Sequence, residues 1–226
     1  IKLNTNKDAS IYYTLDGSIP SIKSIKYNDS IIIDTTKVLK ALAFSDSLKS
    51  DIITHSYILE KRKFNLPVVS ITINDDEMFD PVNGLYSKGL NAASESPYRG
   101  ANFHKDKELE INIEYFDTAN NLGFNQPAGL KIFGGYSRYL PQKSFSIISR
   151  EEYGDKDFNY PIFDNLKYKK YKSFILRNSG SDNNRSHFRD ILMTSLVKPL
   201  SFDIQEYKVC VVFINGEYWG IYNIRE

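Results

Sequence analysis

The sequence contains few of the residues that build disulfide frameworks and zinc sites. Its 226 residues include one cysteine, Cys210, and three histidines, His55, His104 and His187. One thiol cannot close a disulfide within the chain, and one cysteine with three histidines does not supply the ligands of a zinc site. Cys210 lies in the apolar run YKVCVVFI, which predicts a buried strand in which the thiol is a small apolar side chain. We therefore expect no metal site in this chain.

An excess of charge of one sign and long apolar runs are missing as well. The 29 basic and 28 acidic residues leave a net charge of +1, which argues against nucleic acid and anionic membrane surfaces as partners. No apolar run approaches the roughly 18 residues of a membrane-spanning helix. The chain begins at Ile1 without a leader and stops at Glu226 in what resembles the exit of a strand. We interpret it as a piece of a longer protein.

Common catalytic motifs are also absent. None of the three histidines is accompanied by a G-x-S-x-G nucleophile elbow, and the sequence has neither a Walker phosphate loop nor a dinucleotide fingerprint. No motif indicates the paired carboxylates of a glycoside hydrolase. Any activity must therefore be sought in less familiar motifs.

Residues 1–59 predict a small β-sandwich of short alternating strands, with Asp16-Gly17 as a tight turn. The string YTLDGSIPS within this stretch resembles the chitobiase/hexosaminidase C-terminal type of module, which is fibronectin-III-like. The resemblance implies an accessory module of a secreted bacterial protein. A spacer role is favoured, and binding of a cell-wall glycan is the alternative, in which Tyr12, Tyr13 and Tyr27 would stack on a sugar. Residues 60–65 (EKRKFN) are expected to form a linker.

Residues 66–226 predict an α+β second domain, so that the fold class is mainly β with a sandwich followed by an antiparallel sheet and one helix. Asn74 and Glu77 have the spacing of a capping box for a short helical turn, and residues 84–104 predict an exposed loop. Between Asp182 and Pro199, one helical face carries Phe188, Ile191, Leu192 and Leu196, and we expect it to pack on the sheet. Asn215-Gly216 predicts the last hairpin.

The stretch GLKIFGGYSRYLPQKSFSIISR (129–150) is the strongest candidate for a ligand site. A glycine-bearing turn lets backbone N–H groups approach an anion, and Lys or Arg neutralises its charge. The candidate residues are Gly134, Gly135, Ser137, Arg138 and Lys143. The structural alternative is a bulged turn followed by a solvated lysine at a strand end.

Four ordered stretches resemble the spore-coat-protein-H (CotH) kinase family: LGFNQPAGLKIFGGYSRYLPQKSFSIISREEYG, FNYPIF, FILRNSGSD…FRD and VVFINGEYWGIYNIRE. The resemblance covers residues 66–226. It implies the small lobe of an atypical kinase that transfers the γ-phosphate of ATP, with a divalent metal, to Ser or Thr of secreted or coat proteins. The glycine turn would then lie over the phosphates, Lys143 would pair with them, Arg138 would add a second contact, and Glu226 would lie at the hinge that meets adenine. Supporting residues near the predicted helix start are Arg177, Asn178, Asp182, Arg189 and Asp190.

Two departures from the kinase pattern limit this interpretation. No Glu occurs between Asp182 and Pro199 to pair with Lys143, so either Asp190 is the substitute or Lys143 is held differently. The metal-binding acidic motif of the family lies in the large lobe, beyond residue 226. We therefore expect the full-length parent to use ATP and Mg or Mn. We expect this fragment to be inactive and to hold no tightly bound cofactor. The expected location is extracellular, on the surface or spore coat of a bacterium. The alternatives are a non-enzymatic surface or spore-coat scaffold and a polysaccharide-associated module.

Overall fold

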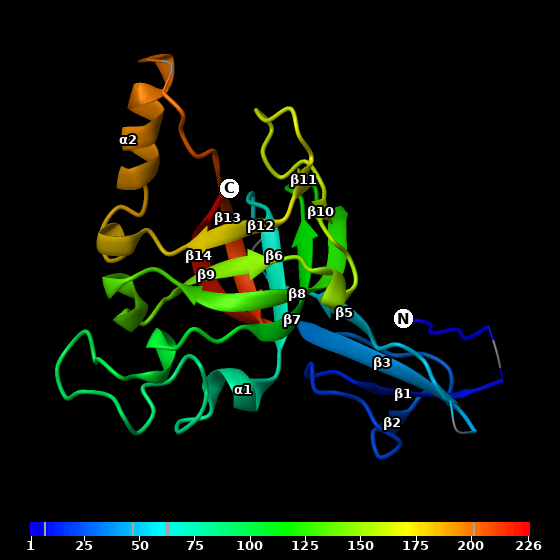
Figure 1. Cartoon of the computed structure of the whole chain (residues 1–226). Helices are drawn as coiled ribbons and strands as arrows, with labels where there is room; N and C mark the ends of the chain where they lie inside the picture. Colours follow the sequence, from blue (N-terminus) through cyan, green and yellow to red (C-terminus); the bar gives the residue numbers. More distant parts are fainter. Residues whose placement is uncertain (7, 47, 62–63, 201) are drawn as a thin grey trace.

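The computed structural model describes residues 1–6, 8–46, 48–61, 64–200 and 202–226 (Figure 1). Its strands form two larger sheets that lie on either side of the predicted linker 60–65, of which residues 62 and 63 fall outside the described residues. The chain is mainly β, as expected. The division into domains at residues 59 and 66 stays a prediction.

The first sheet is built around a long central strand. Its strands are β1 (Ser10–Thr14), β2 (Ile25–Lys26), β3 (Lys37–Ser45), β4 (Leu48–Lys49) and β5 (Ile53–Tyr57). Their order is β2-β1-β3-β4, β5 also pairs with β3, and every pairing is antiparallel. The expected sandwich is thus a single sheet in the described residues. The buried side of β5 packs against the outer face of the second sheet, which is described next. The second sheet therefore lies where a sandwich would have its second layer.

The second sheet closes into a barrel. Its strands in order are β12 (Ser173–Arg177), β14 (Glu217–Arg225), β13 (Tyr207–Ile214), β6 (Val68–Ile73), β7 (Leu109–Phe116), β8 (Leu122–Phe133) and β9 (Ser144–Ile148). Neighbours are antiparallel except β13 and β6, which run parallel with Val211 opposite Val68. Strand alternation turns apolar side chains into the barrel, including Val69, Ile71, Phe145 and Cys210, all fully buried. Burial also raises the pKa of the Cys210 thiol well above its usual value.

Short elements decorate this barrel. They are α1 (Asp75–Phe79), η1 (Asn102–His104), η2 (Tyr136–Tyr139), η3 (Glu151–Tyr153), β10 (Phe158–Asn159), β11 (Lys170–Tyr171), η4 (Gly180–Asp182), α2 (Arg189–Val197) and η5 (Lys198–Leu200). The predicted capping of α1 is confirmed, because the Asn74 side chain accepts a hydrogen bond from Glu77 N at 3.1 Å. Asn215 and Gly216 form the predicted β13–β14 turn with φ values of 50° and 82°.

Helix α2 does not pack on the sheet, so that expectation is wrong. Ile191 is buried, whereas Phe188, Leu192 and Leu196 are 53%, 45% and 62% exposed. Figure 1 shows α2 standing beside the end of the barrel instead of across it. The helix also begins at Arg189, seven residues after Asp182, because Asp182 belongs to η4 and its carboxylate accepts the hydrogen bond from Arg189 N at 3.1 Å.

Buried polar groups join the two sheets. Glu114 on β7 is 1% exposed, and its Oε2 accepts a hydrogen bond from Ser56 N of β5 at 2.7 Å. Ser70 Oγ of β6 donates to Ser56 Oγ at 2.8 Å, and Asn125 Nδ2 of β8 donates to Thr54 O at 2.7 Å. Hydrogen bonds to buried charged groups are among the stronger ones in proteins. The first sheet is therefore held against the outside of β6, β7 and β8.

Candidate functional site

The glycine turn joins β8 to β9 at one end of the barrel. Gly134 has φ 106°, and a Cβ there would come within 2.7 Å of Ser137 Oγ. This backbone conformation favours glycine over any residue with a side chain. A Cβ on Gly135, in contrast, would meet no atom within 4 Å. Gly134 is thus required by the turn itself, while the space around Gly135 is open.

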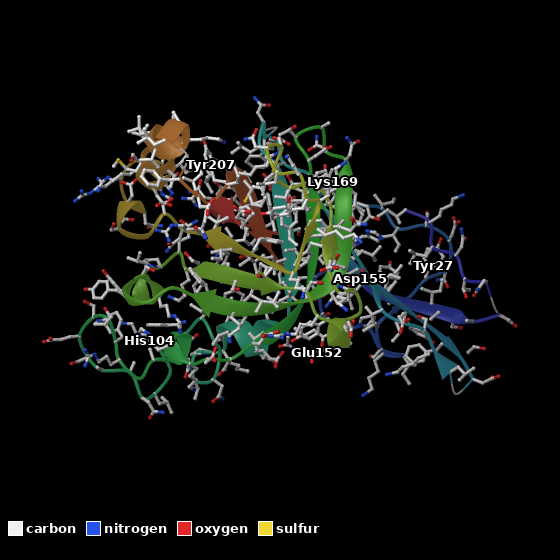
Figure 2. The ribbon with its side chains drawn as sticks, turned by 45° about the horizontal axis from the view of Figure 1, so that its top comes forward. Tyr27, His104, Glu152, Asp155, Lys169 and Tyr207 are labelled. Carbon is white, nitrogen blue, oxygen red and sulfur yellow. The ribbon has the colours of Figure 1, made fainter. Side chains whose placement is uncertain are left out.

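Arg138 fastens this turn to the loop before β7. Its Nε donates to Gly134 O at 2.5 Å, and its Nη1 donates to His104 O at 3.2 Å. Figure 2 shows His104 at the end of the molecule opposite Tyr27, which follows β2 of the first sheet. Two of the guanidinium nitrogens are therefore engaged by carbonyl groups of the chain, and Arg138 has a structural role in this conformation.

Lys143 is buried, which excludes the alternative of a solvated strand end. It is 3% exposed, and its Nζ donates to Leu140 O at 2.9 Å. The ammonium lies 4.3 Å from the ring centroid of Phe103 and 4.6 Å from that of Tyr86, which are cation–π distances. Burial lowers the pKa of Lys143 from 10.5 to about 8, because removal from water disfavours the charged form.

The surroundings of Lys143 are held by further hydrogen bonds. The Tyr86 hydroxyl accepts from Lys143 N at 3.1 Å and donates to Pro141 O at 2.5 Å. On the other side, the Tyr222 hydroxyl of β14 donates to Lys143 O at 2.9 Å. The lysine backbone is thereby tied both to the barrel and to the segment that carries Tyr86.

The predicted supporting residues lie at the adjoining end of β12. Asn178 connects this strand to the segment around Lys143: its N–H donates to Ser144 Oγ at 2.9 Å and its Nδ2 donates to Gln142 O at 2.5 Å. Ser144 Oγ donates in turn to Asn178 Oδ1 at 2.9 Å. Asn178 therefore ties the end of β12 to the segment 142–144, while its supporting role in a ligand site stays a prediction.

Asp190 does not act as the partner of Lys143. Its Oδ2 accepts from Arg225 Nη2 at 2.5 Å and lies 3.2 Å from Arg177 Nε. The geometry at Arg177 Nε is that of an ion pair without a hydrogen bond, since this nitrogen has no hydrogen-bond partner among the described residues. Arg225 is 3% exposed, so the carboxylate neutralises a buried guanidinium. Asp190 thus links the first turn of α2 to β12 and β14, while Lys143 faces aromatic rings elsewhere.

Asp182 and Arg189 form a second local pair. Asp182 is 3% exposed and accepts from Ser186 Oγ at 2.7 Å, and its Oδ1 lies 3.6 Å from Arg189 Nη2. The hydrogen bond from Ser186 holds the pKa of Asp182 below its usual value. Ser179 and His187, at either end of this segment, have φ values of 67° and 62°. Such left-handed conformations are strained for residues with side chains and gather at functional sites.

Glu226 closes the end of β14 against the preceding coil. Its Oε1 accepts from Glu206 N at 3.2 Å, and its carbonyl accepts from Gln205 Nε2 at 3.1 Å. The Tyr168 hydroxyl donates to the same carboxylate, which raises the pKa of Tyr168 to about 12. The described hydrogen-bond partners of Glu226 are thus Tyr168, Gln205 and Glu206, and its predicted contact with adenine stays a prediction.

Four clefts in the described part of the chain are lined by residues other than the predicted phosphate-binding ones. One of about 520 Å³ lies where the two sheets meet, and we call it the inter-sheet cleft. Among the described residues, no group of three or more His, Cys, Asp or Glu side chains could hold a metal ion.

Sequence patterns missed the residues that enclose Lys143. Tyr86 and Phe103 belong to the stretch 84–104, which we expected to be exposed. Leu85 and Phe103 are instead 1% and 2% exposed and belong to the barrel core. Arg225, the buried partner of Asp190, was also missed, since a terminal NIRE sequence gives no sign of burial. The tyrosines considered for sugar stacking are half-buried: Tyr12 packs edge-on against Phe44.

Comparison with known families agrees with these motifs. Residues 130–226 match the family described as CotH kinase protein, and residues 1–57 match the family described as Fn3 associated. The family models thus find a CotH kinase domain preceded by an Fn3-associated domain. No curated protein matches the chain. All the candidate site residues fall within the CotH match, whereas β6 and β7, which complete the barrel, precede it. In the described part of the chain, no helix is both long and apolar enough to cross a membrane.

Proposed function

We propose that this chain supplies the nucleotide-binding small lobe of a CotH-like protein kinase. The kinase would be secreted or displayed on a bacterial surface or spore coat, and it would transfer the γ-phosphate of ATP to Ser or Thr of a protein. The observation that carries the proposal is Lys143, a buried cation at the end of a glycine turn that has no carboxylate partner among the described residues. An unneutralised buried ammonium is suited to an anionic ligand, because a phosphate would replace the charge partner that the chain omits.

The residues of the chain fit part of the chemistry that ATP requires. Lys143 would pair with phosphate oxygens once its bond to Leu140 O is exchanged for them, and Gly135 leaves open space beside the turn. Arg138 would contribute only after leaving the carbonyls of Gly134 and His104. Mg or Mn, when bound, would neutralise charge on the phosphates. The proposal assigns no metal ligand to the described residues, in which no suitable cluster occurs.

The proposal is tested by nucleotide binding in two matched variants. Lys143→Met removes the buried ammonium and keeps the aliphatic stem, whereas Lys169→Met removes an exposed lysine of the same length. In the natural full-length protein, we expect ATP with Mg or Mn to raise the melting temperature of the wild type and of Lys169→Met but not of Lys143→Met. The wild type and Lys169→Met should also transfer labelled phosphate to a Ser/Thr acceptor protein, whereas Lys143→Met should not. Equal nucleotide stabilisation of both variants would contradict the role of Lys143.

The burial of Lys143 also favours a second candidate, a non-enzymatic scaffold. In that case the aromatic rings and Leu140 O are the permanent partners of the lysine, and the glycine turn is purely structural. The same experiment separates the two functions. A full-length protein that neither gains stability from ATP with metal nor transfers phosphate would be a scaffold.

A further inference from the structure

The inter-sheet cleft is lined by both parts of the molecule. The first sheet contributes the turn Asp16–Ile19, together with Lys40 and Thr54, and the barrel side contributes Thr72, the start of α1 and the start of β7. Figure 1 shows α1 and the strands β1 and β2 on the same side of the molecule, flanking the place where the two sheets meet. The hydrogen bonds of Glu114, Ser56 and Asn125 described above hold these walls together. The cleft is therefore formed by the contact between the two sheets, which these hydrogen bonds hold in place.

Acidic side chains make up most of the charged residues that line this cleft. The carboxylates are those of Asp16, Asp75, Asp76, Glu77 and Glu110, and the one cation among the lining residues is Lys40. All five carboxylates are exposed. The whole chain has a net charge of +1, so the negative charge of this cleft is a local excess. Such a surface attracts cations and repels anions within the Debye length.

Part of this negative charge has no partner within the chain. Asp75 accepts a hydrogen bond from Asn215 Nδ2 at 2.7 Å, and Asp16 accepts one from Ser18 N at 3.0 Å. The side-chain carboxylates of Asp76 on α1 and Glu110 on β7 make no hydrogen bond and no ion pair with any described residue. The charge of Glu110 does act on Lys40, whose pKa is lowered by burial and raised in part by this carboxylate. Both carboxylates therefore keep oxygen atoms that an external donor can bind.

A buried hydroxyl in the same cleft also lacks a partner. Thr72 of β6 is 1% exposed, it lines the cleft, and its Oγ1 has no hydrogen-bond partner among the described residues. Its neighbour on the same face of the strand, Ser70, is satisfied by Ser56. Leaving a buried hydroxyl unsatisfied is costly, and a ligand that donates a hydrogen bond would remove this cost. The unpartnered Thr72 therefore points to a ligand independently of the carboxylates.

We propose that the inter-sheet cleft binds a Lys- and Arg-rich segment of another protein, with one cationic side chain bonded to Thr72. The carboxylates are spread over α1, β7 and the β1–β2 connection, so they suit several spaced positive charges better than a point ion. A metal ion is disfavoured because no cluster of three potential ligands occurs among the described residues. A volume of about 520 Å³ accommodates side chains of an extended segment. This proposal does not depend on kinase activity.

The test is the binding of a fluorescent peptide of alternating Lys and Gly, measured by anisotropy at low and high salt. A peptide with acetylated lysines is the neutral control. We expect the charged peptide to bind in a salt-dependent way and the neutral peptide not to bind. The variant Asp76→Asn/Glu110→Gln should lose affinity by about tenfold. Thr72→Val should lose affinity by roughly fivefold while remaining folded.

A matched control removes two exposed carboxylates that lie outside the cleft. These are Glu95 and Asp203, replaced as Glu95→Gln/Asp203→Asn, and we expect no change in affinity. Because all four replaced carboxylates are exposed, loss of folding is not expected in either variant, and circular dichroism verifies this. An equal loss of affinity in the control, absence of binding at low salt, or a free polyamine that binds as tightly as the peptide would overturn the proposal.

Discussion

At the scale of single residues, Lys143 is the feature that most separates this chain from an ordinary β-barrel. Two opposing effects act on its ammonium. The rings of Tyr86 and Phe103 and the carbonyl of Leu140 stabilise the charge, whereas loss of water destabilises it. Desolvation is the stronger effect, because the pKa falls to about 8. A charged Lys143 therefore costs folding free energy unless an anion is present, which is the property expected of a ligand-binding lysine.

This balance predicts a pH dependence of stability. In the unfolded chain Lys143 keeps its proton up to about its ordinary pKa of 10.5, whereas the folded chain releases it near pH 8. Between these pH values the unfolded state binds more protons than the folded state. The contribution of Lys143 to the free energy of unfolding therefore increases as the pH rises. Lys143→Met removes the effect. Urea unfolding at pH 7.5 and pH 10 should show the wild type gaining stability relative to Lys143→Met, and a constant difference between them would contradict the burial of the charge.

At the scale of elements, α2 shows how a helix can be attached without burying its apolar side. Ile191 is its buried residue, and most of its other apolar side chains are exposed. The attachment is instead electrostatic: Asp190 in the first turn meets Arg225 and Arg177 of two neighbouring strands. An acidic residue in the first helical turn also interacts favourably with the helix dipole. The ion pairs therefore position the start of α2, and the rest of the helix extends away from the barrel.

Replacement of Asp190 tests this attachment. Asp190→Asn leaves the buried guanidinium of Arg225 without its counter-charge, which should lower the free energy of unfolding by about 3 kcal/mol. Asp164→Asn is the matched control, because the Asp164 side chain is 79% exposed in its ion pair with Lys208, and its loss should cost less than about 1 kcal/mol. Chemical denaturation measures both values. Equal effects of the two variants would mean that α2 is held by other contacts.

The same elements indicate how far sequence reasoning reaches. Local signals were sufficient for the capping of α1 by Asn74, the Asn215-Gly216 hairpin and the alternating strand β7, since each depends on residues close together in the chain. The closed barrel, with β6 parallel to β13, depends on pairing between distant segments. Periodicity identified the apolar face of α2 but carries no information about which surface covers it. The burial of Lys143 was missed for the same reason, because its rings come from residues 86 and 103.

At the scale of the whole molecule, polar contacts join the two sheets, and several of them are made by Glu114. This buried carboxylate accepts from Ser56 N, lies 3.4 Å from His55 Nδ1 and is reached by Asn125 Nδ2 at 3.3 Å. A buried carboxylate is stable only when its oxygens are satisfied. The first sheet supplies two of these partners, so it both covers the charge and is held in place by it. The walls of the inter-sheet cleft are therefore maintained by the same group.

The joint should weaken as the pH rises, because one of its partners is titratable. The hydrogen bond to Glu114 raises the pKa of His55 above 6.5, and burial opposes this without cancelling it. A base with a raised pKa in the folded state adds stability below its unfolded pKa and loses that contribution as the pH rises through its folded pKa. His55→Gln should therefore destabilise the protein at pH 5.5 and have a smaller effect at pH 8.5. Thermal unfolding at both pH values measures the difference between wild type and variant. A difference that is the same at both values would mean that the neutral imidazole serves equally well, and that the attachment of the first sheet rests on Ser56 and Asn125 instead of the charge of His55.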